Sequence, residues 1–177
     1  LSAGLWRGWR AFPDALGVAV RFGTSAGARA PGELDLLFGT FRYLWHLPLA
    51  PFTTDTRDFF ANTYWAVLPF DVDGLGRCRL RLRPVAKRRN GEDRLDRLRR
   101  AVAAGEAEFV LEARTGSAWQ PLARILLLEE LPADPIGLRF EPYATGRGVR
   151  PLGFLTELRR VVYVRVQAAR TVGKYIR

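Results

Sequence analysis

The sequence has little of what most metal and disulfide sites require. Its 177 residues include one cysteine, Cys78, one histidine, His46, and no methionine. A lone cysteine excludes an internal disulfide framework and a multi-cysteine zinc site, and a lone histidine excludes a histidine-rich metal cluster. No run of about 18 uncharged apolar residues occurs, so no membrane-spanning helix is expected. Residues 1–20 also lack the regions of a signal peptide, and a cytoplasmic location is therefore the default expectation.

Length and composition are typical of one globular domain, and we expect a single domain over residues 1–177. The chain begins at Leu1 without an initiator methionine, so we expect part of its N-terminal region to be missing. The sequence leaves the oligomeric state open, a dimer included.

Positive charge exceeds negative charge. The 28 lysines and arginines against 18 acidic residues give a formal net charge of +10, nearly all of it from arginine. Such a surplus can serve nucleic acid, an anionic membrane surface or an anionic cofactor. The densest basic cluster, Lys87 to Arg100, is interrupted by Glu92, Asp93 and Asp96, a mixture typical of a solvated helix. We therefore expect no specific nucleic-acid partner.

The hydrophobic pattern predicts an α+β fold in which an antiparallel barrel or curved sheet is accompanied by a few helices. Alternation and turn residues predict strands at Leu16–Phe22, within Leu34–Leu44, at Thr63–Asp71, Arg77–Val85, Ala107–Ala113 and Trp119–Leu128. The last of these is too apolar for an exposed edge strand. A helix is predicted at Glu92–Ala104, and His46–Asp58 and Leu131–Pro151 read as irregular segments.

A closing helix is predicted over residues 152–172, and it carries an unusual stripe. At 3.6 residues per turn, Arg159, Tyr163, Val166 and Arg170 share one side. A phenol between two guanidiniums faces either water or something anionic. A tyrosine phenolate is one of the few axial ligands of ferric haem, and an arginine one turn away lowers the pKa that opposes its ionisation.

Several segments resemble the catalase family in the same order along the chain. Residues 16–22, Leu-Gly-Val-Ala-Val-Arg-Phe, resemble the Arg-Gly-Phe-Ala-Val-Lys-Phe stretch of catalases, and Asp35-Leu36-Leu37 follows at the matching place. The region 63–83 resembles the hairpin after the essential barrel loop of catalases. The segments 139–143, 150–154 and 159–163 resemble the end of the compact proteins of that superfamily, such as small bacterial haem peroxidases and allene oxide synthases. The resemblance covers roughly residues 13–172.

The resemblance implies haem b between a catalase-like antiparallel β-barrel and the C-terminal proximal helix. Tyr163 would then be the iron ligand, Arg159 would keep it ionised and Arg170 would pair with a propionate. Phe38 or Phe41 would pack on the porphyrin face. The implied activity is an oxidoreductase reaction of the peroxidase type on hydrogen peroxide or on an organic or lipid hydroperoxide.

The distal half of the family's site differs in this chain. Catalases place a distal histidine ahead of the segment where this sequence begins, and their distal asparagine falls near Gly39 or Thr40. Thr40, the candidate on the distal side, donates one hydrogen bond, whereas an amide donates two. This difference favours weak peroxidase or organic-hydroperoxide chemistry over fast catalase activity.

Other chemically active residues have simpler interpretations. His46 lies outside the matching strand and is expected to be structural. Two neighbouring arginines can lower the pKa of Cys78, but no base accompanies it, so a nucleophilic role is not expected. Asp55 and Asp58 are expected to begin a helix or turn.

Two alternative functions remain open on the sequence alone. The chain can be a haem-free relative that keeps the barrel as a binding or interaction module. It can also be a basic module for nucleic acid or another acidic surface, which predicts binding that weakens steeply with salt.

Overall fold

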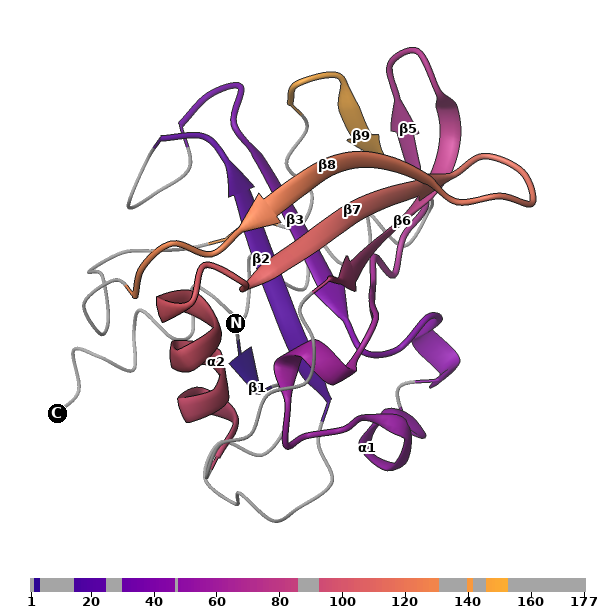
Figure 1. The fold of residues 1–177 in the computed structure, drawn as a ribbon. Coiled ribbons are helices and arrows are strands. Elements are labelled where there is room, and N and C mark those ends of the chain that lie inside the picture. The colour runs from indigo at the N-terminus through magenta and orange to yellow at the C-terminus, as the bar shows by residue number, and fades with distance from the viewer. Residues whose placement is uncertain are drawn as a thin grey trace, which may run out of the picture.

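A computed structural model describes residues 2–3, 15–24, 30–46, 48–85, 93–130, 140–141 and 146–152. These segments form an α+β fold in which a mostly antiparallel sheet curls into a half-barrel accompanied by a few short helices (Figure 1). The predicted closing helix, with Arg159, Tyr163 and Arg170, lies outside the described residues.

The strands are joined by antiparallel pairing throughout. Their order in the sheet is β1-β2-β3-β4-β6-β5-β9, and β7 pairs with both β6 and β8. The bounds are β1 Ser2–Ala3, β2 Leu16–Phe22, β3 Leu34–Gly39, β4 Tyr64–Trp65, β5 Phe70–Val72, β6 Gly76–Pro84, β7 Glu108–Arg114, β8 Gln120–Leu126 and β9 Val149–Pro151. The long strand β6 thus connects the two parts of the sheet, and β7 and β8 cross in front of β2 and β3 in Figure 1.

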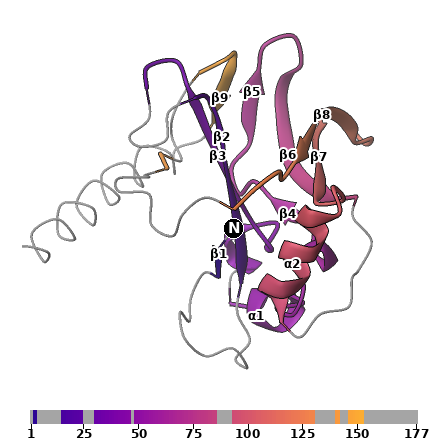
Figure 2. The ribbon, with the colours of Figure 1, turned by 60° about the vertical axis from the view of Figure 1, so that its left-hand side comes forward.

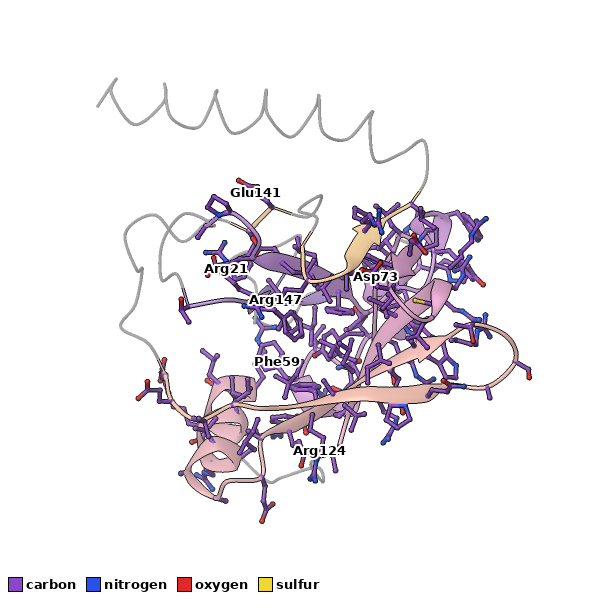
Figure 3. The ribbon with its side chains drawn as sticks, turned by 90° about the horizontal axis from the view of Figure 1, so that it is seen from above. Arg21, Phe59, Asp73, Arg124, Glu141 and Arg147 are labelled. Atoms are coloured by element: carbon purple, nitrogen blue, oxygen red, sulfur yellow. The ribbon has the colours of Figure 1, made fainter. Side chains whose placement is uncertain are left out.

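The core fills the inner side of this half-barrel. On β2 and β3, every second residue faces it, as the alternation in the sequence predicts. The largest fully buried apolar side chains are Tyr64, Phe109, Leu16, Leu36, Leu80 and Leu82. Seen from above, Phe59 lies in the interior between the strands (Figure 3).

Helix α2, Arg94–Ala103, packs Ala101 into the core and leaves Arg99 and Arg100 exposed, whereas Arg94 and Arg97 are half-buried. It begins where predicted because the Asp93 carboxylate accepts hydrogen bonds from the backbone N–H groups of Leu95 and Asp96. It ends at Gly105, whose φ of +67° is the left-handed conformation that glycine adopts without a Cβ clash. Figure 2 shows α2 beside the ends of β7 and β8.

Three short helical turns lie within and at the two borders of His46–Asp58, the stretch expected to be irregular. They are η1, Leu44–His46, α1, Ala50–Thr53, and η2, Phe59–Ala61. Asp58 begins η2 by accepting a hydrogen bond from the N–H of Phe60, as predicted for a turn start. In both views α1 lies at the end of the molecule opposite β5 and β9 (Figures 1 and 2).

Two predictions about strands are wrong. The predicted strand Thr63–Asp71 is interrupted after Trp65 and resumes as β5 at Phe70, because residues 66–69 lie opposite only Arg79 and Leu80 of β6. Strand β8 pairs only with β7 in the described part of the sheet, and its Leu122 and Leu126 are 40% and 46% exposed. The apolar run thus does not exclude an outer strand, since Ala123 and Ile125 face the core while the alternate leucines face outward.

Candidate functional site

The face of β2 and β3 that points away from the core carries mostly small side chains. In register across the two strands, Gly17 lies opposite Gly39, and Ala19 lies opposite Leu37. Because two facing glycines have no side chain and the alanine has only a methyl group, the surface above the backbone is nearly flat here. We call these four residues the low-relief strip. A planar group can lie closer to the sheet here than on a face covered by large side chains.

One aromatic ring borders this strip. A Cβ built on Gly39 would lie 2.7 Å from Cε1 of Phe41, so the Phe41 ring lies over Gly39 and requires glycine there. Phe41 is half-buried, whereas Phe38 is 4% exposed and packs in the core on the opposite face of β3. Of the two predicted aromatic contacts, Phe41 is therefore the one beside the strip.

Thr40, the distal-side candidate, follows directly after β3 and has structural partners. Its Oγ1 accepts a hydrogen bond from the N–H of Leu16 at 3.1 Å and lies 2.7 Å from Oγ1 of Thr54. The Thr54 hydroxyl in turn donates to the carbonyl of Ala50 at 2.7 Å. Because each hydroxyl has one proton, the arrangement that satisfies all three contacts has Thr40 donating to Thr54. That bond occupies the single proton with which Thr40 can polarise a ligand.

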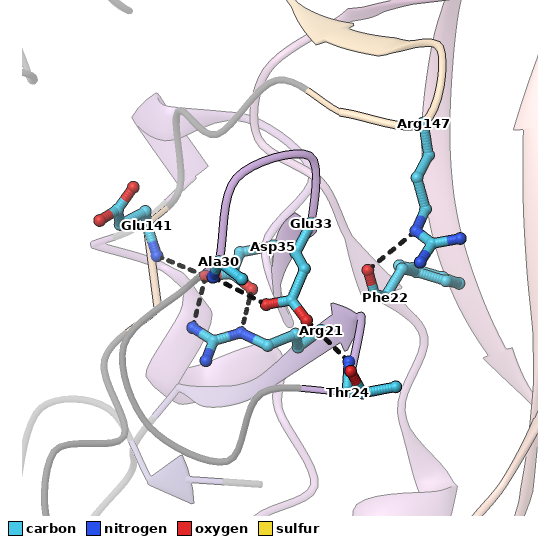
Figure 4. A network of polar contacts seen from close by, with 8 residues as sticks. All are labelled: Arg21, Phe22, Thr24, Ala30, Glu33, Asp35, Glu141 and Arg147. Atoms are coloured by element: carbon cyan, nitrogen blue, oxygen red, sulfur yellow. Dashed lines mark hydrogen bonds and ion pairs between the residues drawn. The ribbon is translucent and has the colours of Figure 1, made fainter.

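A buried ion pair lies at the other end of the strip. Nε of Arg21 is 2.7 Å from Oδ1 of Asp35, and its Nη2 donates to Oδ2 at 2.9 Å (Figure 4). The two side chains are 7% and 0% exposed. Oδ2 of Asp35 also accepts from the N–H of Glu141 at 2.8 Å, and the Arg21 guanidinium lies 5.1 Å from the centre of the Phe140 ring. The hydrogen bond with Asp35 raises the pKa of Arg21, so the guanidinium stays charged.

The chain after residue 140 is held against the β2–β3 hairpin by further contacts. Arg147 Nε donates to the carbonyl of Phe22 at 3.0 Å (Figure 4). A Cβ on Gly146 would come within 2.7 Å of the carbonyl oxygen of Gly32, so only glycine allows this approach. The N–H of Leu152 then donates to the carbonyl of Pro69 at 2.8 Å. Residues 149–152 therefore lie beside β5.

Arginines and aromatic rings form a second cluster on the outward faces of β4, β6 and β7. The Arg81 guanidinium lies 4.1 Å from the centre of the Trp119 ring and 5.6 Å from that of Trp65. Arg81 and Arg83 also pair with the Glu112 carboxylate at 2.6 and 3.0 Å. Burial raises the pKa of Glu112, but the hydrogen bonds from Arg81 and Arg83 outweigh it and the net pKa is lowered.

The same cluster extends to the turn after β3. Arg79 lies 4.7 Å from the centre of the Tyr43 ring, which stacks on Trp45 at 4.6 Å with 4° between the planes. Arg42 lies over both Tyr43 and Trp65 at 5.3 and 5.2 Å. In the described residues no carboxylate pairs with Arg42 or Arg79. Cation–π contacts of this kind fix the guanidiniums in place and leave their charge available.

The structure shows the surroundings of His46 and Cys78, two residues whose roles were predicted from the sequence. His46 is structural, packing edge-on against Tyr43 and Trp45, although it is only half-buried. The expectation that neighbouring arginines lower the pKa of Cys78 is wrong. Cys78 is 2% exposed on the core side of β6, and burial, followed by the charge of Asp71, raises its pKa. Arg77 and Arg79 point to the other side of the strand, as alternation requires.

Two features of this region, the Arg21–Asp35 pair and the arginine–aromatic cluster, were not predicted from the sequence. The Arg21–Asp35 pair had a signal, because an aspartate within the apolar run Leu34–Gly39 needs a buried partner. The arginine–aromatic cluster had only a weak signal, since its members come from distant segments. Among the described residues, no group of three or more histidine, cysteine, aspartate or glutamate side chains is placed to hold a metal ion.

Comparison with protein-family models, with curated proteins and with solved structures finds no match for this chain. No helix in the described segments is both long and apolar enough to span a membrane.

Proposed function

We propose that this chain is a catalase-like haem protein that acts on hydrogen peroxide or on an organic or lipid hydroperoxide. The observation that carries the proposal is the low-relief strip on a curled antiparallel sheet, in the β2–β3 segment that resembles catalases. The Phe41 ring already lies over Gly39, so the part of the strip open to a flat ligand such as a porphyrin is Gly17, Ala19 and Leu37.

The residues around the strip suit a flat, mostly apolar ligand with charged edges. Phe41 offers a ring at one end, and Ala19 and Leu37 offer apolar contact along the strip. The Arg21–Asp35 pair at the other end is internally neutralised and buried, so it fixes the hairpin and leaves no free charge beneath the ligand.

Tyr163 is the proximal ligand in this proposal and binds as the phenolate. Free tyrosine titrates near pKa 10, so a neighbouring positive charge is needed to hold the proton off at neutral pH. In the proposal Arg159, four residues earlier in the sequence, supplies that charge, and Arg170, seven residues later, pairs with a propionate. The bound haem supplies a ferric iron whose anionic ligand favours heterolysis of a hydroperoxide over reversible oxygen binding.

The distal side determines which peroxide reaction is favoured. The Thr40 proton is directed to Thr54, and no amide stands at this position to orient a small peroxide. A larger organic hydroperoxide can be positioned by apolar contacts along the strip instead. We therefore propose peroxidase-type chemistry on organic or lipid hydroperoxides as the main activity, with slow hydrogen peroxide turnover.

The test is an absorption titration of the full-length chain with ferric haem. The proposal predicts a saturable Soret band at one haem per chain, with the charge-transfer features of a tyrosinate–iron complex. Tyr163→Phe should abolish those features, and Tyr175→Phe, in the same C-terminal stretch, should keep them. The haem-bound protein should then consume an organic hydroperoxide faster than hydrogen peroxide.

Two results would contradict the proposal. A featureless visible spectrum without saturable binding would favour the haem-free binding module. Saturable binding that Tyr163→Phe leaves unchanged would show that another group ligates the iron.

A further inference from the structure

Three large apolar side chains are exposed together on the turn that joins β3 to η2. Trp45 is 71% exposed, Leu49 is 59% exposed and Phe52 is 79% exposed. They follow one another at spacings of four and three residues, the spacing of one side of a helix. Backbone hydrogen bonds from His46 to Tyr43, Leu49 to His46 and Phe52 to Leu49 hold the segment in successive helical turns. We call Trp45, Leu49 and Phe52 the apolar protrusion.

The segment is oriented with its apolar side chains outward for a structural reason. Ala50, a small residue, is the one that α1 buries, at 1% exposure, and Thr54 ties the end of the turn to Thr40. The turn is thus fixed to the body of the protein through small and polar contacts. The larger Leu49 and Phe52 side chains therefore have no place in the core and remain in water.

Positive charge borders the protrusion. The Tyr43 ring stacks on the Trp45 ring, with 4.6 Å between the ring centres. The Arg79 guanidinium lies 4.7 Å from the centre of the Tyr43 ring. Arg42 contacts the same tyrosine at 5.3 Å. Neither arginine pairs with a carboxylate of the described chain, so two positive charges without a carboxylate partner lie over the Tyr43 ring, which stacks on the exposed Trp45.

We infer that the apolar protrusion docks the protein on an anionic lipid bilayer surface. Trp is favoured at the interface, Leu and Phe favour the acyl region just beneath it, and arginines pair with anionic head groups. Nucleic acid fits less well, because it offers no apolar partner for Leu49 and Phe52, and arginines already lie over the Tyr43 and Trp65 rings. A symmetric contact between two copies would bring Arg42 and Arg79 of both chains together without carboxylates to balance them.

The inference does not depend on haem, because it concerns a surface and not the proposed ligand site. The experiment is co-sedimentation of the full-length chain with vesicles of phosphatidylcholine alone or of phosphatidylcholine with a minority of phosphatidylserine, measured with and without haem. We expect binding to the mixed vesicles, weakened by high salt, and little binding to phosphatidylcholine alone.

Substitutions locate the docking surface. Phe52→Ser should weaken binding about tenfold or more, since a Phe side chain leaves the interface. Leu128→Ser is the matched control, because Leu128 is 75% exposed but lies after β8. Arg79→Gln should weaken binding to mixed vesicles about fivefold. Arg77→Gln, which removes the same charge two residues away near the β5–β6 turn, should have a smaller effect.

Three results would overturn the inference. The first is no binding to either vesicle. The second is equal loss in Phe52→Ser and Leu128→Ser. The third is a concentration-dependent dimer in analytical ultracentrifugation that Phe52→Ser converts to monomer, which would make a second copy the occupant. Because Phe52 is largely exposed, its substitution should leave the melting temperature unchanged, and a melt checks that each variant is folded.

Discussion

Replacing Asp35 with alanine should destabilise the protein far more than removal of any surface carboxylate. Asp35 is fully buried, and it binds the Arg21 guanidinium through both oxygens while also accepting from the N–H of Glu141. Asp35→Ala leaves the Arg21 charge buried without the Asp35 carboxylate. Breaking a buried pair in this way costs about 3–5 kcal/mol in the free energy of unfolding. For a chain of this length that corresponds to a drop of roughly 6–20 °C in melting temperature.

Asp73→Ala is the matched control. Asp73 also binds the late segment of the chain, pairing with Arg150 at 3.0 Å, but the two side chains are 66% and 60% exposed. Solvent screens such a pair, and we expect a loss of about 0–1 kcal/mol. Urea denaturation and thermal melts of both variants measure the difference. Equal losses in Asp35→Ala and Asp73→Ala would refute the reasoning.

A double variant separates the charge from the packing. In Arg21→Leu with Asp35→Leu, neither buried charge remains, and apolar side chains fill part of the same space. Such replacements are often neutral or stabilising, so the double variant should be more stable than Asp35→Ala alone. A double variant less stable than Asp35→Ala would indicate that the buried Arg21 charge is not the main cost of the single variant, because both variants lack the hydrogen bond from Glu141.

Three further predictions follow from buried polar groups and are tested in the same denaturation and labelling experiments. Tyr64→Phe removes the donor to the carbonyl of Phe59, a 2.7 Å bond to a fully buried group, and should cost about 1–2 kcal/mol, whereas Tyr43→Phe should cost little. Cys78, whose pKa burial raises, should react with a thiol reagent at pH 8 only in unfolded protein, and fast labelling of the folded chain would contradict its placement. The pKa of Glu112 is lower in the folded protein than in the unfolded chain, where it lies at about 4.3. Glu112 should therefore stabilise the fold fully above about pH 4.3, and this stabilisation should be lost as the pH falls through the lower folded pKa. Glu112→Gln should remove this pH dependence.

The elements that the sequence predicted well are those whose local signals agree with their packing. Strand β2 has the predicted bounds, Leu16–Phe22, because strict alternation places every second residue in the core. Helix α2 was predicted from its charge pattern and from Gly105, and Asp93 fixes its start. The β5–β6 turn was predicted because Gly74, at a φ of +80°, adopts a conformation that favours glycine.

The structural features that the sequence did not predict all depend on contacts between distant segments. Strand β9, Val149–Pro151, forms only because β5 offers it an edge, and nothing within residues 131–151 signals a strand. The low-relief strip arises from register, since Gly17 and Gly39 are far apart in the sequence and meet only when β2 pairs with β3. The sequence also did not indicate that Phe38 lies on the core face of β3 while the Phe41 ring, after the strand, lies over Gly39.

Thr40 connects the two proposals, and its substitution distinguishes them. Its hydroxyl bonds both the start of β2, at Leu16, and Thr54 at the end of α1, so it ties the turn that carries Phe52 to the sheet that carries the low-relief strip. If Thr40 is structural, Thr40→Val loosens α1. Vesicle binding then weakens while the haem spectrum and the peroxide rate stay unchanged, and Thr40→Ser restores docking. If Thr40 acts on a bound peroxide instead, Thr40→Val slows peroxide turnover and leaves vesicle binding intact. The hydrogen-bond geometry favours the structural role, because a threonine whose single proton is held by Thr54 has none left for a ligand.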